Sequence, residues 1–279
     1  MTGRASLRAS VVPWLSLMRA HAAVAAALLA VLGAHLSGAL RDVGAAALLA
    51  AAAAGLATIG GNALNDVHDA AIDRINRPDR PIPSGAISPA GAGRLAVAAF
   101  AAAVATAALA SPWCLAVALV NCALLALYAV RSKRLGFGKG LVVAYLVAST
   151  VLFGALDPAR IEVGTACLAL CAGLATLARE LVKDIEDMAG DRAAGAATLP
   201  LRIGPRKARR IADLALLAAV AISFVPWLVR PAPLPSLLVL LLGGAVLGLS
   251  TRVGDAARAQ RLVMVGSLVA GMAYLLAAA

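Results

Sequence analysis

The chain has few charged residues, few cysteines and no long polar stretch. Only 14% of its 279 residues are charged, and only 14 are acidic. No polar segment is long enough to fold alone as a soluble domain, so we predict a single membrane-embedded domain over residues 1–279. The 4 cysteines lack a histidine or second pair at metal-ligand spacing, which favours packing over a metal or redox role. The first twenty residues lack a small-residue cleavage site after a short apolar core, so we expect no cleavable signal peptide.

Hydrophobic residues dominate instead, at 62% of the chain. Segments of about 17–25 apolar residues cross bilayers as helices, because backbone exposed to lipid must satisfy its own hydrogen bonds. We therefore predict an all-α, polytopic membrane protein with about nine transmembrane helices around one central cavity. The predicted spans are 21–40, 43–64, 94–110, 113–130, 138–156, 163–182, 211–229, 232–250 and 261–279.

The basic residues predict the orientation of these spans. With a cytoplasmic N-terminus and nine alternating spans, 22 of the 25 Lys and Arg fall on the inner side, and only Arg41, Arg160 and Arg230 fall outside. This asymmetry follows the positive-inside rule and predicts a multi-pass protein of the cell membrane. Most of the residues behind the +11 net charge are then expected to contact membrane lipids of the inner leaflet. No nucleic-acid module is recognisable, so neither a nucleic-acid nor a protein partner is predicted.

Two acidic triplets share the spacing D-x-x-D-x-x-x-D. On a helix, positions i, i+3 and i+7 lie within about 60° of one another, so each triplet places three carboxylates on one helical face. Such a stack repels itself, and Mg²⁺ bound through carboxylates and substrate phosphates removes that cost. Six of the 14 acidic residues lie in these triplets: Asp66, Asp69 and Asp73, and Asp184, Asp187 and Asp191.

The similarity between the two triplets extends to the residues around them. Asn62 and Glu180 each lie four residues before the first aspartate, and Asn65 and Lys183 lie one residue before it. The triplets open two inner polar loops, about 65–93 and 183–210. We therefore predict two pseudo-equivalent four-helix halves and one extra helix, with both acidic faces on a shared cavity that opens toward the cytoplasm.

The first loop continues as Arg77-Pro78-Asp79-Arg80-Pro81-Ile82-Pro83. Proline is unfavourable inside a helix and biases the residue before it away from helical torsions, so the helix should end near Asn76. The prolines predict a stiff loop that holds Arg77 and Arg80 near the metal site, where guanidinium groups bind phosphate bidentately. A solvated turn is the alternative.

These residues resemble the UbiA-type intramembrane prenyltransferases, whose nine spans also match the predicted number. Closest in motif are the digeranylgeranylglyceryl phosphate synthases, although Val67-His68 and Gly140 depart from residues common in relatives. The resemblance is carried by Asn65-Asp66-x-x-Asp69-x-x-x-Asp73, by Asp73-Arg74-Ile75-Asn76-Arg77-Pro78 with Arg80-Pro81-Ile82-Pro83-Ser84-Gly85, by Tyr128-Ala129-Val130-Arg131-Ser132-Lys133, by Arg179-Glu180-Leu181-Val182-Lys183-Asp184, by the second triplet and by Gly190-Asp191-Arg192.

The resemblance implies that Mg²⁺ joins a polyprenyl diphosphate, such as a geranylgeranyl diphosphate, to both triplets. Metal-binding and catalytic roles fall on the six aspartates, with Asn65 as a neutral ligand. Tyr128 lines the cavity or belongs to an interfacial aromatic belt. Substrate binding is expected of Arg19, Asn62, Asn65, Arg77, Arg80, Tyr128, Arg131, Lys133 and Lys183.

The best candidate for the acceptor is geranylgeranylglyceryl phosphate, whose phosphate Arg19 would bind. An aromatic acceptor such as 4-hydroxybenzoate, homogentisate or a chlorophyllide-like pigment is the alternative, with Arg19 holding a carboxylate. An ion-coupled transporter is disfavoured, because both triplets lie at helix ends on one side rather than near the midplane. A membrane alcohol phosphotransferase is disfavoured, because the compact aspartate motif with internal glycines that such enzymes use is missing from this sequence.

Overall fold

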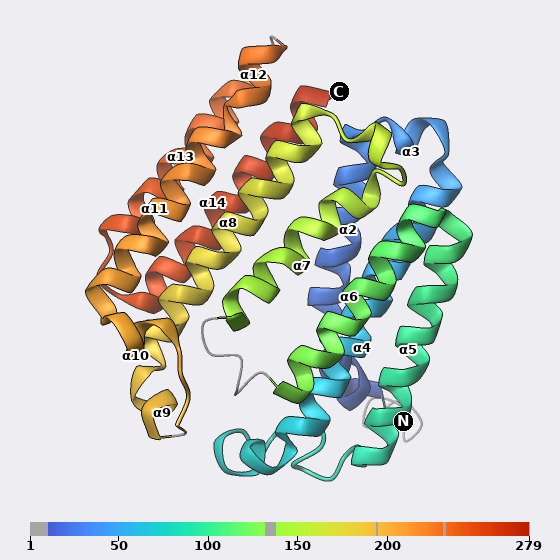
Figure 1. Cartoon of the computed structure of the whole chain (residues 1–279), viewed down its shortest axis with the longest axis vertical. Helices are drawn as coiled ribbons and strands as arrows, with labels where there is room; N and C mark the ends of the chain where they lie inside the picture. Colours follow the sequence, from blue (N-terminus) through green and yellow to red (C-terminus); the bar gives the residue numbers. More distant parts are fainter. Residues whose placement is uncertain (1–10, 132–137, 194, 231–232, 279) are drawn as a thin grey trace, which may run out of the picture. The chain divides into compact units, whose positions relative to one another are not determined.

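The computed structural model describes residues 11–131, 138–193, 195–230 and 233–278 (Figure 1). Every regular element in these ranges is a helix, which confirms the all-α prediction. Contacts divide the chain into two compact units. The first unit is Met1–Val31 with Val43–Arg131, and the second is Leu32–Asp42 with Ser132–Ala279.

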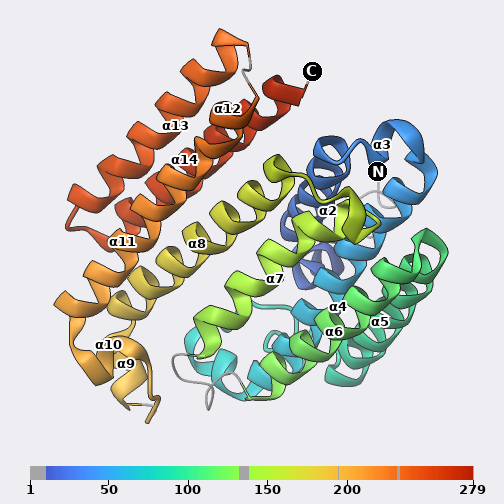
Figure 2. The ribbon, with the colours of Figure 1, turned by 45° about the horizontal axis from the view of Figure 1, so that its top comes forward.

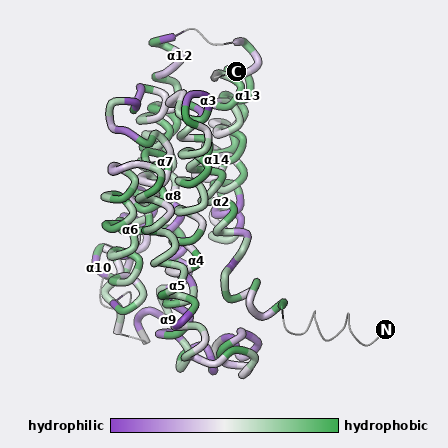
Figure 3. The backbone as a smooth tube through the Cα atoms, turned by 90° about the vertical axis from the view of Figure 1, so that its right-hand side faces the viewer, coloured by the Kyte–Doolittle hydropathy of each residue, from purple (hydrophilic) through white to green (hydrophobic). Residues whose placement is uncertain are grey.

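The helices fall on the predicted apolar segments, but not all are long enough to span. Within the described ranges, 7 helices are long and apolar enough to cross a membrane. The helix Val11–Met18 and α2 (Ala20–Leu36), which meet at a bend of 48°, bring the number to 8 if they form one span. Another apolar helix, α7 (Gly138–Gly154), has only 17 residues. The chain is a multi-pass membrane protein, with hydrophobic residues along most of each long helix (Figure 3). The ninth span, the single cavity and the orientation remain predictions.

The first unit is built around α4 (Gly44–Asn76), which packs against both α5 (Pro89–Ala110) and α6 (Pro112–Arg131). Small residues allow these helices to approach closely, as is common between membrane helices. A Cβ added at Gly60 would lie 2.8 Å from the Phe100 ring, and one at Gly61 would lie 2.8 Å from a Leu125 methyl group. The small residues of these helices therefore allow close helix packing, in addition to making the helices apolar.

The predicted end of α4 at Asn76 is confirmed. The loop that follows is anchored rather than solvated beyond Arg80, because Ile82 and Ile87 are 4% and 3% exposed. The first unit thus holds the loop against its core. These two side chains pack in one cluster with Leu17, Ala63, Ala92 and Ala96.

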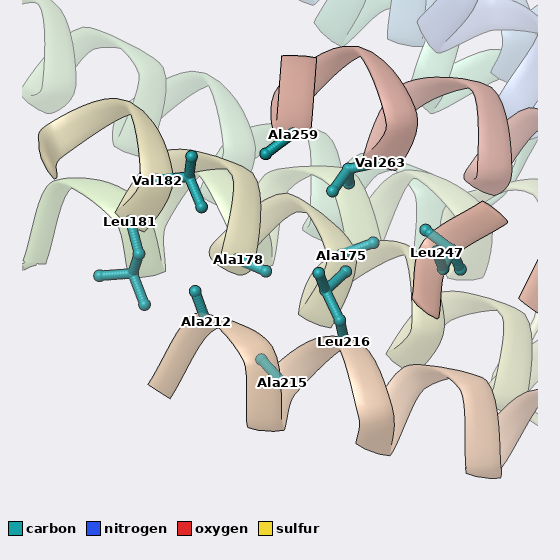
Figure 4. Close-up of a cluster of buried hydrophobic side chains, with 10 residues drawn as sticks. All are labelled: Ala175, Ala178, Leu181, Val182, Ala212, Ala215, Leu216, Leu247, Ala259 and Val263. Carbon is teal, nitrogen blue, oxygen red and sulfur yellow. The ribbon is translucent and has the colours of Figure 1, made fainter. Parts of the chain in front are cut away.

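The second unit is built around α8 (Val163–Glu186), which lies beside α7, α11 and α14 (Figure 2). Figure 4 shows the buried contact of α8 with α11, α13 and α14, where Ala175, Ala178 and Leu181 point toward the neighbouring helices. The unit's other elements are α3 (Ala39–Asp42), η1 (Pro158–Arg160), α9 (Met188–Ala193), α10 (Leu199–Ile203), α11 (Pro205–Ser223), α12 (Val225–Val229), α13 (Leu234–Arg252) and α14 (Ala256–Ala278).

The three arginines predicted on the outer side all pair with acids of the second unit. Arg160 lies 2.9 Å from Asp42, and Arg41 contacts the same carboxyl at 3.2 Å. These guanidinium groups, Arg160 first, lower the pKa of Asp42. Arg230 lies 3.3 Å from Glu162. These pairs agree with the predicted alternation of the connecting segments, while the side that faces the cytoplasm remains a prediction.

Close packing of α13 on α14 gives a direct test. A Cβ at Gly243 would lie 2.7 Å from the backbone nitrogen of Ala270, whereas one at Gly248 has no neighbour within 4 Å. We expect Gly243→Ala to destabilise the protein by about 1–3 kcal/mol, because the helices must move apart. The matched control Gly248→Ala should leave the melting temperature unchanged or higher. Thermal unfolding in detergent measures both, and equal shifts would contradict the described packing.

Candidate functional site

The first acidic triplet lies on the last three turns of α4, as its spacing predicts. Asp66 and Asp73 have side chains only 7% and 9% exposed, and Asp69 is half-buried. A buried carboxylate is costly unless a cation or several hydrogen bonds compensate it. The structure supplies cations from two other segments of the first unit.

Arg19 is the first of these cations. Its Nη2 donates to Asp66 Oδ1 at 2.6 Å, and its Nη1 donates to Asn62 Oδ1 at 3.4 Å. Asn62 in turn donates through Nδ2 to the carbonyl oxygen of Met18 at 3.4 Å. Arg19 has a φ of 46° and stands at the bend between the helix Val11–Met18 and α2. A non-glycine residue in this region costs of order 1 kcal/mol or more, and such residues cluster at functional sites.

Arg80 is the second cation, and it bridges two members of the triplet. Its Nη1 lies 2.6 Å from Asp73 Oδ2 and 3.4 Å from Asp66 Oδ1. The backbone loop that carries it is held by a bond from Arg77 N to Asp73 O at 2.8 Å and by one from Ser84 N to Arg80 O at 2.9 Å. The predicted placement of Arg80 beside the triplet therefore agrees with the structure.

Asn65 and Asp69 form a separate pair on α4. Asn65 Nδ2 donates to Asp69 Oδ2 at 2.9 Å. This bond fixes the amide so that its carbonyl oxygen remains as an acceptor. The first unit thus brings together Arg19, Asn62, Asp66, Asp73 and Arg80, with the Asn65–Asp69 pair on the same helix.

In the second unit, Lys139 neutralises the first acid of the second triplet. Its Nζ lies 3.0 Å from Asp184 Oδ1, and the side chains are 18% and 3% exposed. Lys139 lies on the first turn of α7, and Asp184 lies near the end of α8. Glu180, which matches Asn62 in the repeat, is also buried and is paired with Arg179.

The second triplet departs from the prediction that it occupies one helix. The helix α8 ends at Glu186, Asp187 caps it with φ −83° and ψ 0°, and Asp191 belongs to α9. A ψ near 0° differs from that of a regular α-helix, so the axis is interrupted at Asp187. Backbone hydrogen bonds from Asp187 N to Lys183 O and from Asp191 N to Asp187 O, both 2.9 Å, continue across this break.

Several predicted substrate-binding residues are not gathered with the acids. Arg77, Arg131 and Lys183 are exposed, and their side chains make no hydrogen bond or ion pair in the described part of the chain. Tyr128 is half-buried on α6 and has other contacts of its own. Lys133 lies outside the described residues.

Lys139 is the residue that sequence reasoning missed. The sequence indicates only that it is one of the inner-side basic residues, because it lies 45 residues before the acid that it contacts. The sequence signal that could have identified it is its position, just inside the start of an apolar span. Such a residue needs an acidic partner or a route to the interface.

Within the described ranges, no group of three or more His, Cys, Asp or Glu side chains is arranged to hold a metal ion. The residues nevertheless fit Mg²⁺ chemically, because carboxylate and amide oxygens are its preferred protein ligands. One observation supports the fit. Asp191 Oδ2 is buried and has no hydrogen-bond partner among the described residues, which leaves a negative oxygen uncompensated.

Residues 21–269 match the UbiA prenyltransferase family. The chain is 40% identical over 267 residues to a protein of Methanopyrus kandleri named digeranylgeranylglyceryl phosphate synthase, with 94% of this chain and 97% of that one covered. It is 46% identical over 221 residues to a Methanoculleus marisnigri protein of the same name, with 78% of each chain covered.

Two solved structures share the fold. One concerns digeranylgeranylglyceryl phosphate synthase in membranes, with a TM-score of 0.81, 25% identity and coverage of 96% of this chain and 98% of that one. The other is a UbiA homologue from Archaeoglobus fulgidus bound to GPP and Mg²⁺. Its TM-score is 0.67 at 15% identity, with 96% and 100% of the two chains covered, so the likeness is one of fold alone.

Proposed function

Because this chain belongs to the UbiA prenyltransferase family, we propose that it transfers a geranylgeranyl group from its diphosphate to geranylgeranylglyceryl phosphate, with Mg²⁺ as cofactor. Prenyl transfer itself follows from the family. The observation that supports the lipid acceptor is the 40% identity, over nearly the whole of both chains, to the M. kandleri synthase. An aromatic acceptor has no such support, and family membership removes the reason to consider a transporter.

Mg²⁺ is proposed to bind the oxygens of Asn65 and of the six aspartates of the two triplets. When bound, it neutralises diphosphate oxygens and stabilises the charge that develops on the leaving diphosphate. The UbiA homologue from A. fulgidus, which binds GPP and Mg²⁺, supports the use of a divalent metal ion. The active site is proposed to open toward the cytoplasmic side of the cell membrane.

The basic residues are proposed to exchange partners when the substrate binds. Arg19, Arg80 and Lys139 each hold a carboxylate at 2.6–3.0 Å. A diphosphate beside the same carboxylates offers these cations more oxygen acceptors, and Arg in particular bonds phosphate bidentately. Arg80 is therefore assigned to the prenyl diphosphate, and Arg19 to the acceptor's phosphate.

The chemical step breaks the bond between the allylic carbon and the diphosphate oxygen. The acceptor's hydroxyl oxygen forms the new ether bond to that carbon, its proton is released, and diphosphate leaves. Positive charge on the allylic carbon must be kept from water until the acceptor attacks, and apolar surroundings provide this. Cations already fixed near the departing charge need no rearrangement of solvent, which favours the step.

The proposal is tested with purified protein in detergent and labelled geranylgeranyl diphosphate. Geranylgeranylglyceryl phosphate and 4-hydroxybenzoate are offered in parallel, with Mg²⁺ or with EDTA. We expect label only in the glyceryl ether and only with Mg²⁺. Label in the benzoate would replace the proposed acceptor by an aromatic one. Transfer that persists in EDTA and is not increased by Mg²⁺ would overturn the metal assignment.

Arg80→Ala should raise the KM for geranylgeranyl diphosphate about tenfold, because a charge-assisted bond to diphosphate is lost. Steady-state rates at varied diphosphate concentration measure it. Arg74→Ala is the matched control, since Arg74 is an exposed arginine on the last turn of α4. An unchanged KM in Arg80→Ala would mean that Arg80 only neutralises Asp66 and Asp73.

A further inference from the structure

A cavity of about 480 Å³ lies in the second unit, where four helices come together at one end. It is open to the surface and formed by the end of α8, the start of α11, the end of α13 and the start of α14. Its volume lies in the range of about 300–1,000 Å³ that is usual for small-molecule sites. We call it the arginine pocket, because Arg206, Arg209, Arg210 and Arg252 line it.

The charge of the arginine pocket is largely uncompensated. Arg206, Arg210 and Arg252 make no hydrogen bond or ion pair through their side chains with any described residue. Arg209 is different, because its Nε donates to Asp213 at 2.9 Å and its Nη2 donates to the carbonyl oxygen of Ser250 at 2.7 Å. One arginine is thus fixed as part of the wall, and three remain to bind an anion.

Apart from Thr251, the remaining side chains of the wall are apolar, with Val182 and Ile185 of α8 among them. On α8, Val182 lies roughly 160° around the helix from Asp184, and Ile185 lies roughly 100° from it. Val182 points toward α14 in Figure 4. The pocket therefore lies on a different face of α8 from Asp184, and none of the three aspartates lines it.

Convergence on one cavity separates these arginines from ordinary inner-leaflet basic residues. Lys207 at the start of α11 and Arg258 at the start of α14 are exposed, and neither lines the pocket. A ligand that suits the pocket must carry several anionic oxygens, for which guanidinium groups are well matched, and an apolar portion that contacts α8. The pocket lies at the ends of membrane helices, where lipid headgroups lie.

We propose that the arginine pocket binds the phosphate headgroup of an anionic membrane lipid. The lipid phosphate accepts hydrogen bonds from Arg206, Arg210 and Arg252, and its glycerol and first methylenes contact Val182 and Ile185. This site is additional to the prenyl-transfer site. Its test measures binding rather than turnover, so it succeeds or fails independently of the proposed function.

The experiment titrates the full-length protein in neutral detergent with dioctanoyl phosphatidic acid, dioctanoyl phosphatidylcholine and sodium phosphate, with binding followed by microscale thermophoresis. We expect phosphatidic acid to bind more tightly than the other two. Arg210→Gln with Arg252→Gln should weaken its binding about tenfold or more, because two charged hydrogen-bond donors are lost. The matched double variant Lys207→Gln with Arg258→Gln loses the same charge and should stay within about twofold of the wild type.

If both double variants weakened binding equally, a diffuse positive field would attract the lipid, and the pocket would be overturned as the binding site. If sodium phosphate bound as tightly as phosphatidic acid, the ligand would be a free anion rather than a lipid. Equal binding of phosphatidylcholine would reduce the interaction to apolar adsorption. The single variant Arg206→Gln is a second test of the pocket, and we expect it to bind phosphatidic acid more weakly than the wild type. The site would also be rejected if neither this variant nor the pocket double variant lost affinity.

Discussion

Asp187→Asn lowers the turnover of prenyl transfer by on the order of 10²–10³-fold and leaves the melting temperature at the wild-type value. The reason is the contrast between its exposure and its assigned role. Asp187 is exposed, and its side chain makes no hydrogen bond or ion pair in the described ranges. Its carboxylate therefore contributes little to the fold, whereas the proposed mechanism requires it beside the departing diphosphate.

The adjacent acid provides the control for this variant. Glu186 is also exposed and accepts a bond from Gln260 at 2.9 Å, on a different side of the helix end. Glu186→Gln removes the same charge one residue away and should keep turnover within about twofold of the wild type, as expected for an exposed charge outside the site. Turnover of Asp187→Asn at the wild-type level would remove the second triplet from the mechanism and leave the first alone.

Lys139→Met destabilises the protein by about 3 kcal/mol, because it leaves a buried carboxylate without its cation. Asp184 is 3% exposed and lies 3.0 Å from Lys139. Removing both charges together should restore most of the stability, so Lys139→Met with Asp184→Asn is expected to melt above Lys139→Met alone. Turnover should stay low in both variants, because the single variant lacks a proposed diphosphate-binding cation and the double variant also lacks a proposed metal ligand.

Thermal unfolding in detergent measures the stability of these two variants, and a prenyl-transfer assay measures their turnover. Lys183→Met is the stability control, because it removes an exposed lysine next to the same acid in sequence. It should change the unfolding free energy by no more than about 1 kcal/mol. A double variant no more stable than Lys139→Met would show that the ion pair is not what stabilises α7 against α8.

Local chemistry explains what the sequence could predict. Pro78 ends α4 one turn after Asp73, so both the helix boundary and the nearness of Arg80 to the triplet follow from neighbouring residues. The helical class follows from apolar composition alone. The break at Asp187 was not predicted, because the heptad-like spacing of the three aspartates is equally compatible with a continuous helix.

Long-range pairing could not be predicted in the same way. Arg19 and Asp66 are 47 residues apart, and Lys139 and Asp184 are 45 residues apart. Several basic residues were equally available to each acid by spacing, including Lys183 and Arg131, which the structure leaves exposed. Only the packing of α7 on α8 decides that Lys139, rather than one of these, neutralises Asp184.

The distribution of these ion pairs has a consequence for the order of membrane insertion. Arg19 and Arg80 neutralise acids of the first unit, and Lys139 neutralises an acid of the second. A buried carboxylate that is left without its cation costs roughly 3–5 kcal/mol. Once the ribosome has released residue 131, the acids Asp66 and Asp73 already have their partners. The buried charges of the first unit can therefore be neutralised before residues 132–279 have been synthesised.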